Sequence, residues 1–272
     1  MNVWDLKIQP ERWQPLAKEL EGFLGESISG FEDVRRELVK CKEAEEIDLY
    51  EEKSAGKIID YYCHTRVYLY ELLLWESTYH KWENFKRISL FLKSRGLKNI
   101  LDFGGGIGGL SIYLCERGFK CDYADVYGET FSFANYRFAK HVNRIKSYDL
   151  LKEWPPAGYY DAICAYDVLE HIPGLEKAIE KLALLLKNRG YLISKSTFSG
   201  KGLHLKENER YLDMAILNDL LSRYNLAHLG RVKDSFSTVF LKSIGIKSIA
   251  GIRVKRDKKY GGDFILHRKC IN

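Results

Sequence analysis

The sequence lacks any apolar stretch long enough to cross a membrane. A transmembrane helix needs about 20 consecutive apolar residues, and no run in the 272 residues comes near that length. The first 20 residues carry charges throughout, where a signal peptide would have an apolar core. These two absences predict a soluble protein located in the cytoplasm.

The sequence also lacks a CxxC pair, although it contains six cysteines. These cysteines lie mostly inside apolar runs, which favours buried and reduced thiols. A disulfide framework or a structural zinc site is therefore not expected. Internal repeats and low-complexity segments are absent as well. Apolar residues at 46% and charged residues at 29% are typical of an ordinary globular protein.

Charge is unevenly distributed along the chain. Residues 1–60 hold 15 acidic and 9 basic residues, whereas residues 231–259 hold 9 basic and 2 acidic ones. The basic segment could face an anionic substrate, nucleic acid or a membrane surface, or it could be a solvated polar face. Nucleic acid is not the expected partner, because the sequence has no appended RNA-binding module and no Asn/Asp-Pro-Pro-Tyr motif.

Apolar residues recur every three or four positions from residue 11 to residue 95, as at Trp13, Leu16 and Leu20. This spacing predicts an all-helical N-terminal region over residues 1–95. Residues 61–82 are rich in aromatic side chains, which at helical spacing favour packing. Their position beside the second region, residues 96–272, also suggests a lid over a binding site.

Short β-type runs alternate with helical patterns after residue 96, which is typical of βαβ units and a mostly parallel sheet. The predicted strands lie near residues 98–103, 119–125, 144–148, 160–166 and 190–197. The predicted helices lie near residues 108–117, 128–140, 174–187 and 208–223. Two further strands are predicted at residues 226–232 and 264–268, joined by the basic segment.

The strongest local signal is a glycine-rich loop after the first predicted strand. Asp102 is followed by Gly104, Gly105 and Gly106, and then by two more glycines before a predicted helix. Glycines allow positive φ and close approach of the backbone to a ligand, and a helix N-terminus favours an anionic group. The same spacing satisfies the GxGxxG pattern of dinucleotide-binding domains, so a dehydrogenase stays an alternative.

Acidic residues follow the first three predicted strands. Asp102 at the first can interact through water with a cationic amino acid group, which an NAD site does not need. Asp125 with Val126 after the second can accept hydrogen bonds from both ribose hydroxyls, which serves NAD and S-adenosylmethionine (SAM) equally. Asp149 after the third can accept from an adenine amine, with Leu150 as an apolar contact, or it can simply cap the turn.

These residues together resemble the class I SAM-dependent methyltransferases. The fourth strand strengthens the resemblance, because residues 160–173 read YDAICAYDVLEHIP and contain the VLEHI segment familiar in the methyltransferase-11 and ubiquinone-biosynthesis-like branch. The resemblance covers residues 98–197. It implies a Rossmann-like, doubly wound sheet of seven strands with the last antiparallel, SAM as the cofactor, and Tyr166 and Asp167 among the residues that bind it.

Catalytic candidates are few, because methyl transfer needs alignment and, for a hydroxyl acceptor, a base. His171 follows the fourth strand, and His204 lies in a loop after the fifth. Each histidine could instead have no role beyond the local turn. The ubiquinone-type enzymes resembled here imply a divalent metal at positions matching Asp167, Glu170 and His171, but an Asp replaces their usual Glu, and no metal is expected.

The sequence therefore predicts a SAM-dependent methyltransferase that acts on oxygen, nitrogen or carbon of a small or medium-sized metabolite. Tyr79 and Trp82, which flank His80 and Lys81, are predicted to cover the methionine end of the cofactor. One alternative is methylation of RNA or protein through the basic segment. The others are an NAD-dependent oxidoreductase and a non-catalytic partner protein with the same fold.

Overall fold

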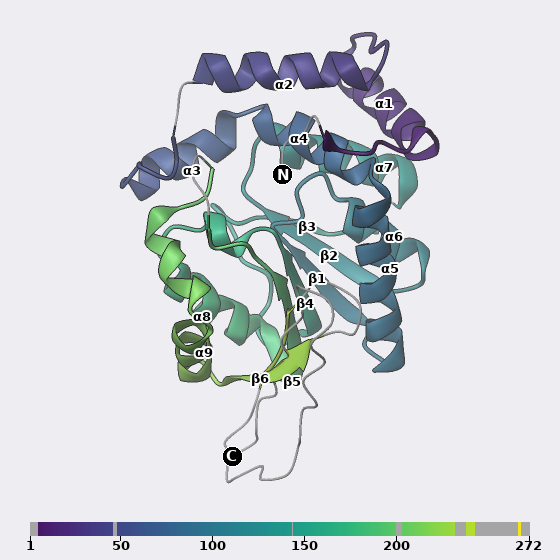
Figure 1. The fold of residues 1–272 in the computed structure, drawn as a ribbon. Helices are drawn as coiled ribbons and strands as arrows, with labels where there is room; N and C mark the ends of the chain where they lie inside the picture. Colours follow the sequence, from purple (N-terminus) through teal and green to yellow (C-terminus); the bar gives the residue numbers. More distant parts are fainter. Residues whose placement is uncertain are drawn as a thin grey trace.

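The computed structural model describes residues 5–45, 48–142, 144–199, 203–231, 238–242 and 266–267. A central sheet runs through the molecule with helices on both of its faces, and further helices lie across one end of the strands (Figure 1). The predicted mixed α/β fold with a mostly parallel sheet and a helical N-terminal region is confirmed.

Five parallel strands form the body of the sheet: β1 (Asn99–Phe103), β2 (Lys120–Asp125), β3 (Ser147–Asp149), β4 (Tyr160–Tyr166) and β5 (Leu186–Lys195). Side chains alternate between the two faces of each strand. Leu101 and Phe103 therefore face one core cluster, and Ile100 between them faces another. Both faces must be covered, which explains why these strands are apolar almost throughout.

The strand order is β3-β2-β1-β4-β5-β7-β6-β8. β7 (Thr238–Lys242) runs antiparallel to both β5 and β6 (Leu226–Arg231), and the two-residue β8 (Leu266–His267) pairs with both. The predicted count of seven strands is therefore wrong, because the described residues already form a sheet of eight. The difference arises in the basic segment 231–259, which was predicted as a connection yet contains β7. Apart from Arg231, the last residue of β6, the rest of that segment lies outside the described residues.

Helices cover the two faces of the sheet unequally (Figure 1). Apolar residues of α8 (Leu175–Leu185) and α9 (Met214–Arg223) pack against one face, while α6 (Gly109–Glu116) and α5 (Tyr79–Ser94) pack against the other. α7 (Glu129–His141) packs against α6 through a smaller cluster. The predicted helix over 208–223 is divided into a 3-10 helix, η3 (Lys206–Leu212), and α9.

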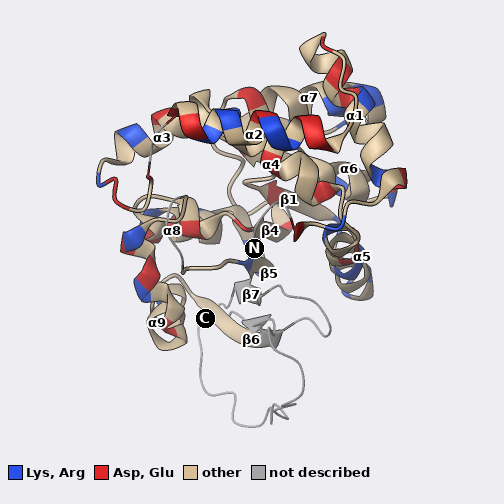
Figure 2. Ribbon diagram, turned by 45° about the horizontal axis from the view of Figure 1, so that its top comes forward, with Lys and Arg blue, Asp and Glu red and all other residues tan. Residues whose placement is uncertain are grey.

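The N-terminal region is helical, as predicted: α1 (Pro10–Leu24), α2 (Phe31–Glu45), α3 (Ala55–His64) and α4 (Val67–Glu76) precede α5. Residues of α1, α2 and α4 form one core cluster that also contains Ile107 of the glycine loop and Phe133 of α7. Acidic and basic residues mark the helices, α2 above all, whereas the central strands show few (Figure 2). The division of the chain at residue 95 stays a prediction.

Five of the six cysteines lie in the part of the chain that the structure describes, and all five are free thiols. Cys115, Cys121 and Cys164 are buried, which agrees with the predicted reduced thiols. Within the same part of the chain, no helix has the combined length and apolar character that a membrane span requires.

Candidate functional site

The glycine loop joins the end of β1 to the start of α6, as predicted. Gly104, Gly106 and Gly108 have φ values of +63°, +56° and +76°, which side chains other than glycine rarely adopt. Space is limiting as well: a Cβ atom added at Gly104 would lie 2.2 Å from a methyl carbon of Val168. Conformation and close packing therefore both require glycine at this position.

Asp125 closes the loop from the neighbouring strand. Its Oδ2 accepts a hydrogen bond from the Gly106 N–H at 2.9 Å, and its Oδ1 accepts one from the Val126 N–H at 2.8 Å. The Tyr123 hydroxyl donates to the Gly106 carbonyl at 2.7 Å, so both backbone groups of Gly106 are fixed from β2. Burial raises the pKa of Asp125 to about 6, against the lowering effect of these backbone hydrogen bonds.

Asp102 lies at the end of β1 and is 2% exposed. Its Oδ2 accepts from both the N–H and the hydroxyl of Ser111 in α6, at 3.1 and 2.8 Å. Burial raises the pKa of Asp102 to about 7, although the Ser111 hydroxyl lowers it. The carboxyl group therefore ties strand to helix, and the predicted water-mediated contact with a cationic ligand group stays a prediction.

A cavity of about 460 Å³ opens over the carboxyl ends of β1, β2 and β4. This volume is in the usual range for small-molecule sites, and ligands of open α/β sheets bind at this edge. Most of the predicted cofactor residues line it: Asp102, Gly104, Gly105, Gly106, Asp125, Val126, Leu150, Tyr166 and Asp167. The structure thus brings together residues from four separate segments of the sequence.

Three predicted cofactor residues do not line this cavity. Asp149 instead accepts hydrogen bonds from the N–H groups of Tyr127 and Leu151 at 3.3 and 3.1 Å, so it fixes two turns. Tyr79 is 59% exposed, and Trp82 packs against aromatic rings of α5 and α6. Successive helical residues point in different directions, and Lys81 is the residue of 79–82 that lines the cavity.

Asp167 follows β4 with a φ of 51°, which is unusual for a residue with a side chain. Its carboxylate lies 3.3 Å from Lys195 Nζ and 3.7 Å from Lys81 Nζ. Burial alone would raise the pKa of Asp167, but the two lysines lower it below the usual range. The residue is therefore an ionised acid fixed by two cations.

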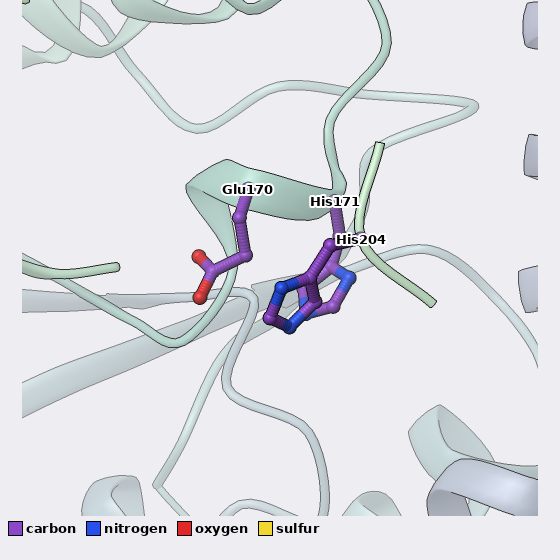
Figure 3. A group of neighbouring side chains, drawn as sticks. All are labelled: Glu170, His171 and His204. Carbon is purple, nitrogen blue, oxygen red and sulfur yellow. The ribbon is translucent and has the colours of Figure 1, made fainter. Parts of the chain in front are cut away.

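No metal is expected from the sequence, and the set that the resemblance implied, Asp167, Glu170 and His171, is not the group that the structure brings together. Glu170, His171 and His204 each offer a ligand atom, and these atoms lie within 4.8 Å of one another. The two imidazoles lie side by side, with ring centroids 5.0 Å apart (Figure 3). One Glu170 oxygen accepts from the Thr197 N–H at 2.8 Å, while the other is buried without a hydrogen-bond partner among the described residues.

His171 lines the cavity, and its protonation follows from its contacts. Its Nδ1 lies 2.7 Å from the Leu203 carbonyl oxygen, which can only accept, so Nδ1 carries the hydrogen and Nε2 has the free lone pair. Burial lowers the pKa of His171, although Glu170 opposes this effect. His204 similarly donates from Nδ1 to the Ser199 carbonyl at 2.6 Å, but it is not part of the cavity lining.

Several lining residues come from the N-terminal helices and were not identified as site residues from the sequence. They are Ile59 and Tyr62 of α3, Tyr68, Leu72 and Glu76 of α4, and Phe85 of α5. The Tyr62 hydroxyl lies 3.1 Å from the Tyr68 hydroxyl. The aromatic density of residues 61–82 was the available signal, but packing residues give the same pattern.

A comparison with protein families decides the class of this site. A family model described as a methyltransferase domain matches residues 74–232. The chain belongs to this family. The resemblance to class I SAM-dependent methyltransferases is thereby confirmed, and with it SAM as the expected cofactor, whereas the branch within the class stays a prediction.

Solved structures similar to this methyltransferase domain share low identity with it. The StiE O-MT, residues 961–1257, is 24% identical over 58% of this chain and 55% of that chain, with a TM-score of 0.42. The 1,6-didemethyltoxoflavin-N1-methyltransferase of Burkholderia thailandensis is 17% identical over 58% and 78%, with a TM-score of 0.43. The chain thus spans about half the length of the StiE structure. No curated protein sequence matches it.

The residues of the methyltransferase domain fit SAM on observations that do not depend on the family. The cavity is lined by apolar side chains such as Leu150 and by the glycine loop. It also contains the buried carboxyl group of Asp102 and the partly buried one of Asp125. An adenosyl amino acid has the matching parts: an apolar base, two ribose hydroxyls and a charged amino acid end.

Proposed function

We propose that this protein transfers the methyl group of SAM to a hydroxyl group of a small or medium-sized metabolite. The observation that carries the proposal is the placement of His171, which lines the cavity and directs Nδ1 to the Leu203 carbonyl, so that Nε2 keeps the lone pair. Burial also lowers the pKa of His171, which favours the neutral imidazole. A neutral imidazole can act as the general base that accepts a hydroxyl proton.

The chain's own residues would hold the cofactor across the carboxyl ends of the strands. Asp125 would accept the ribose hydroxyls, Leu150 and Val126 would contact the adenine, and the loop 104–106 would lie along the amino acid end. When bound, SAM supplies an activated methyl group on a sulfonium. Asp102 holds the loop to α6 through Ser111 while it lines the same cavity.

His171 would then act on the acceptor. Its Nε2 takes the proton of the acceptor hydroxyl, while Nδ1–H stays bound to the Leu203 carbonyl and keeps the imidazole oriented. His204 packs edge-on against His171 and is proposed to hold it in place. Tyr62 and Tyr68 close the cavity from α3 and α4, so we propose that the N-terminal helices exclude water and shape the acceptor pocket.

The test is a transfer assay with radiolabelled SAM and a panel of small alcohols, phenols and amines. We expect transfer to a hydroxyl compound, and we expect His171→Ala to lower kcat by about 10²- to 10⁴-fold without changing the affinity for SAM. The matched control is His64→Ala, because His64 is an exposed histidine of α3 and does not line the cavity. Transfer only to RNA or protein, or an unchanged kcat in His171→Ala, would contradict the proposal.

A further inference from the structure

The corner between α4 and α5 brings two oppositely charged side chains to the cavity. Glu76 is the last residue of α4 and Lys81 lies in the first turn of α5, and both line the cavity. The corner is fixed by its own hydrogen bonds. The Thr78 hydroxyl accepts from the Lys81 N–H at 3.3 Å, and the Trp82 indole donates to the Glu76 carbonyl at 2.9 Å.

Glu76 is a buried carboxylate with an incompletely balanced charge. One oxygen accepts from Arg137 Nη2 at 2.8 Å, but Arg137 is shared with the buried Glu19, whose oxygen lies 2.7 Å from Arg137 Nε. Two carboxylates therefore face one guanidinium, with His141 beside Glu19. A further cation at Glu76 would lower the electrostatic cost of burying this group.

The second oxygen of Glu76 lies against the start of α6. A Cβ atom added at Gly109, the first residue of that helix, would lie 2.0 Å from Glu76 Oε2. Glycine at this position therefore allows the carboxylate to approach the helix N-terminus, where a negative charge is favoured. The same approach places the carboxylate beside the glycine loop, which ends at α6.

Lys81 contributes a cation to the lining of the cavity. Its side chain is 17% exposed, and its Nζ lies 3.7 Å from Asp167 Oδ2. Asp167 also pairs with the closer Lys195, at 3.3 Å, so a second cation stays beside this acid when Lys81 contacts a ligand. Lys81 also acts on Asp102, because its charge lowers the pKa of that residue. Lys81 and the glycine loop line the same cavity.

We propose that this corner binds the amino acid end of SAM, with Glu76 accepting the α-ammonium group and Lys81 pairing with the α-carboxylate. The inference rests on the proposed function and names residues outside the glycine loop. A zwitterion needs one acid and one base, and the corner supplies one of each on opposite sides of a tight turn. Ion-pairing with buried partners is worth more than the same contact in water.

The test uses titration calorimetry on the full chain with S-adenosylhomocysteine and three analogues. One analogue lacks the amino group, one lacks the carboxylate, and 5′-methylthioadenosine lacks both. We expect Glu76→Gln to weaken binding of S-adenosylhomocysteine by about ten- to a hundredfold and to leave the affinity for the deaminated analogue unchanged. Lys81→Met should weaken binding of S-adenosylhomocysteine by a similar factor. It should leave the affinity for the analogue that lacks the carboxylate unchanged.

Glu19→Gln is the matched control, because it removes the other carboxylate partner of Arg137 and does not line the cavity. Glu19→Gln should lower the affinity for all four ligands by the same factor or leave it unchanged. Equal losses for all ligands in Glu76→Gln and Lys81→Met, or no loss, would overturn the inference and leave the proposed function standing. Failure of the unmodified protein to bind any of the four ligands would overturn the proposed function itself.

Discussion

The carboxylate of Asp125 on β2 accepts a hydrogen bond from the N–H of Gly106, with 2.9 Å between the oxygen and the nitrogen. This bond joins two segments that are separate in sequence into one surface, because the acid that would hold a ribose also fixes the loop that would lie under the amino acid. Cofactor affinity and loop conformation should therefore depend on the same carboxylate.

The first prediction concerns pH. Burial raises the pKa of Asp125 to about 6, and only the ionised carboxylate can accept hydrogen bonds from both ribose hydroxyls. Since protonation removes the acceptor, SAM affinity should fall by up to about tenfold for each pH unit below about 6. Calorimetric titrations between pH 5 and 8 would measure this dependence.

The Asp125→Asn variant is the control for that profile, because its side chain cannot ionise. Its weaker affinity should change less with pH over the same range. An affinity of the unmodified protein that is constant down to pH 5 would show that Asp125 does not contact the ligand in its ionised form.

The second prediction concerns the glycine loop. Gly104→Ala should lower both stability and SAM affinity, because the added methyl group meets Val168 and φ is +63°. Gly118→Ala is the matched control, since Gly118 has a φ of +85° but no atom within 4 Å of an added Cβ. It should cost about 1 kcal/mol from backbone strain and leave affinity unchanged. Equal effects of the two variants on affinity would contradict a role for the loop.

The third prediction concerns the buried Arg137. Arg137→Met leaves the Glu19 and Glu76 carboxylates without their shared partner, so the free energy of unfolding should fall by about 3–5 kcal/mol. Arg36→Met, which removes an exposed pair with Asp33, should change it by less than about 1 kcal/mol. Urea denaturation followed by circular dichroism measures both. Similar values for the two variants would refute the idea that Arg137 holds α1, α4 and α7 together.

The fourth prediction concerns metal. Glu170, His171 and His204 could hold a divalent cation, but a metal on His171 Nε2 would occupy the lone pair that the proposed base needs. Dialysis against a chelator should therefore leave kcat unchanged. Loss of activity that added Mg²⁺ or Zn²⁺ restores would instead make these three residues metal ligands and remove His171 as the base.

The sequence was most informative where a motif requires one local conformation. The run from Asp102 to Gly106 has a single sterically favourable role at a strand-to-helix turn, so loop, strand and cavity edge were all predictable from it. Asp125 was predictable from the sheet topology, because the carboxyl ends of neighbouring parallel strands meet at one edge of the sheet.

Residues that reach the site from a helix could not be predicted in this way. Glu76 and Lys81 line the cavity whereas Tyr79 and Trp82 do not, and that choice depends on where α4 ends and how α5 is rotated. The β7 strand was missed because its five residues lie in the basic segment 231–259, which was interpreted as a connection. Pairing with β6, which precedes it in the chain, and with β5, which is distant in sequence, determines its structure.

The central claim is that the cavity over β1, β2 and β4 holds an adenosyl amino acid. Calorimetric titration of the ligand-free protein with S-adenosylhomocysteine and with NAD, repeated on Asp125→Asn, tests it most directly. The account predicts that S-adenosylhomocysteine binds, that NAD does not, and that Asp125→Asn binds about ten- to a hundredfold more weakly. Binding of NAD without binding of S-adenosylhomocysteine would contradict it.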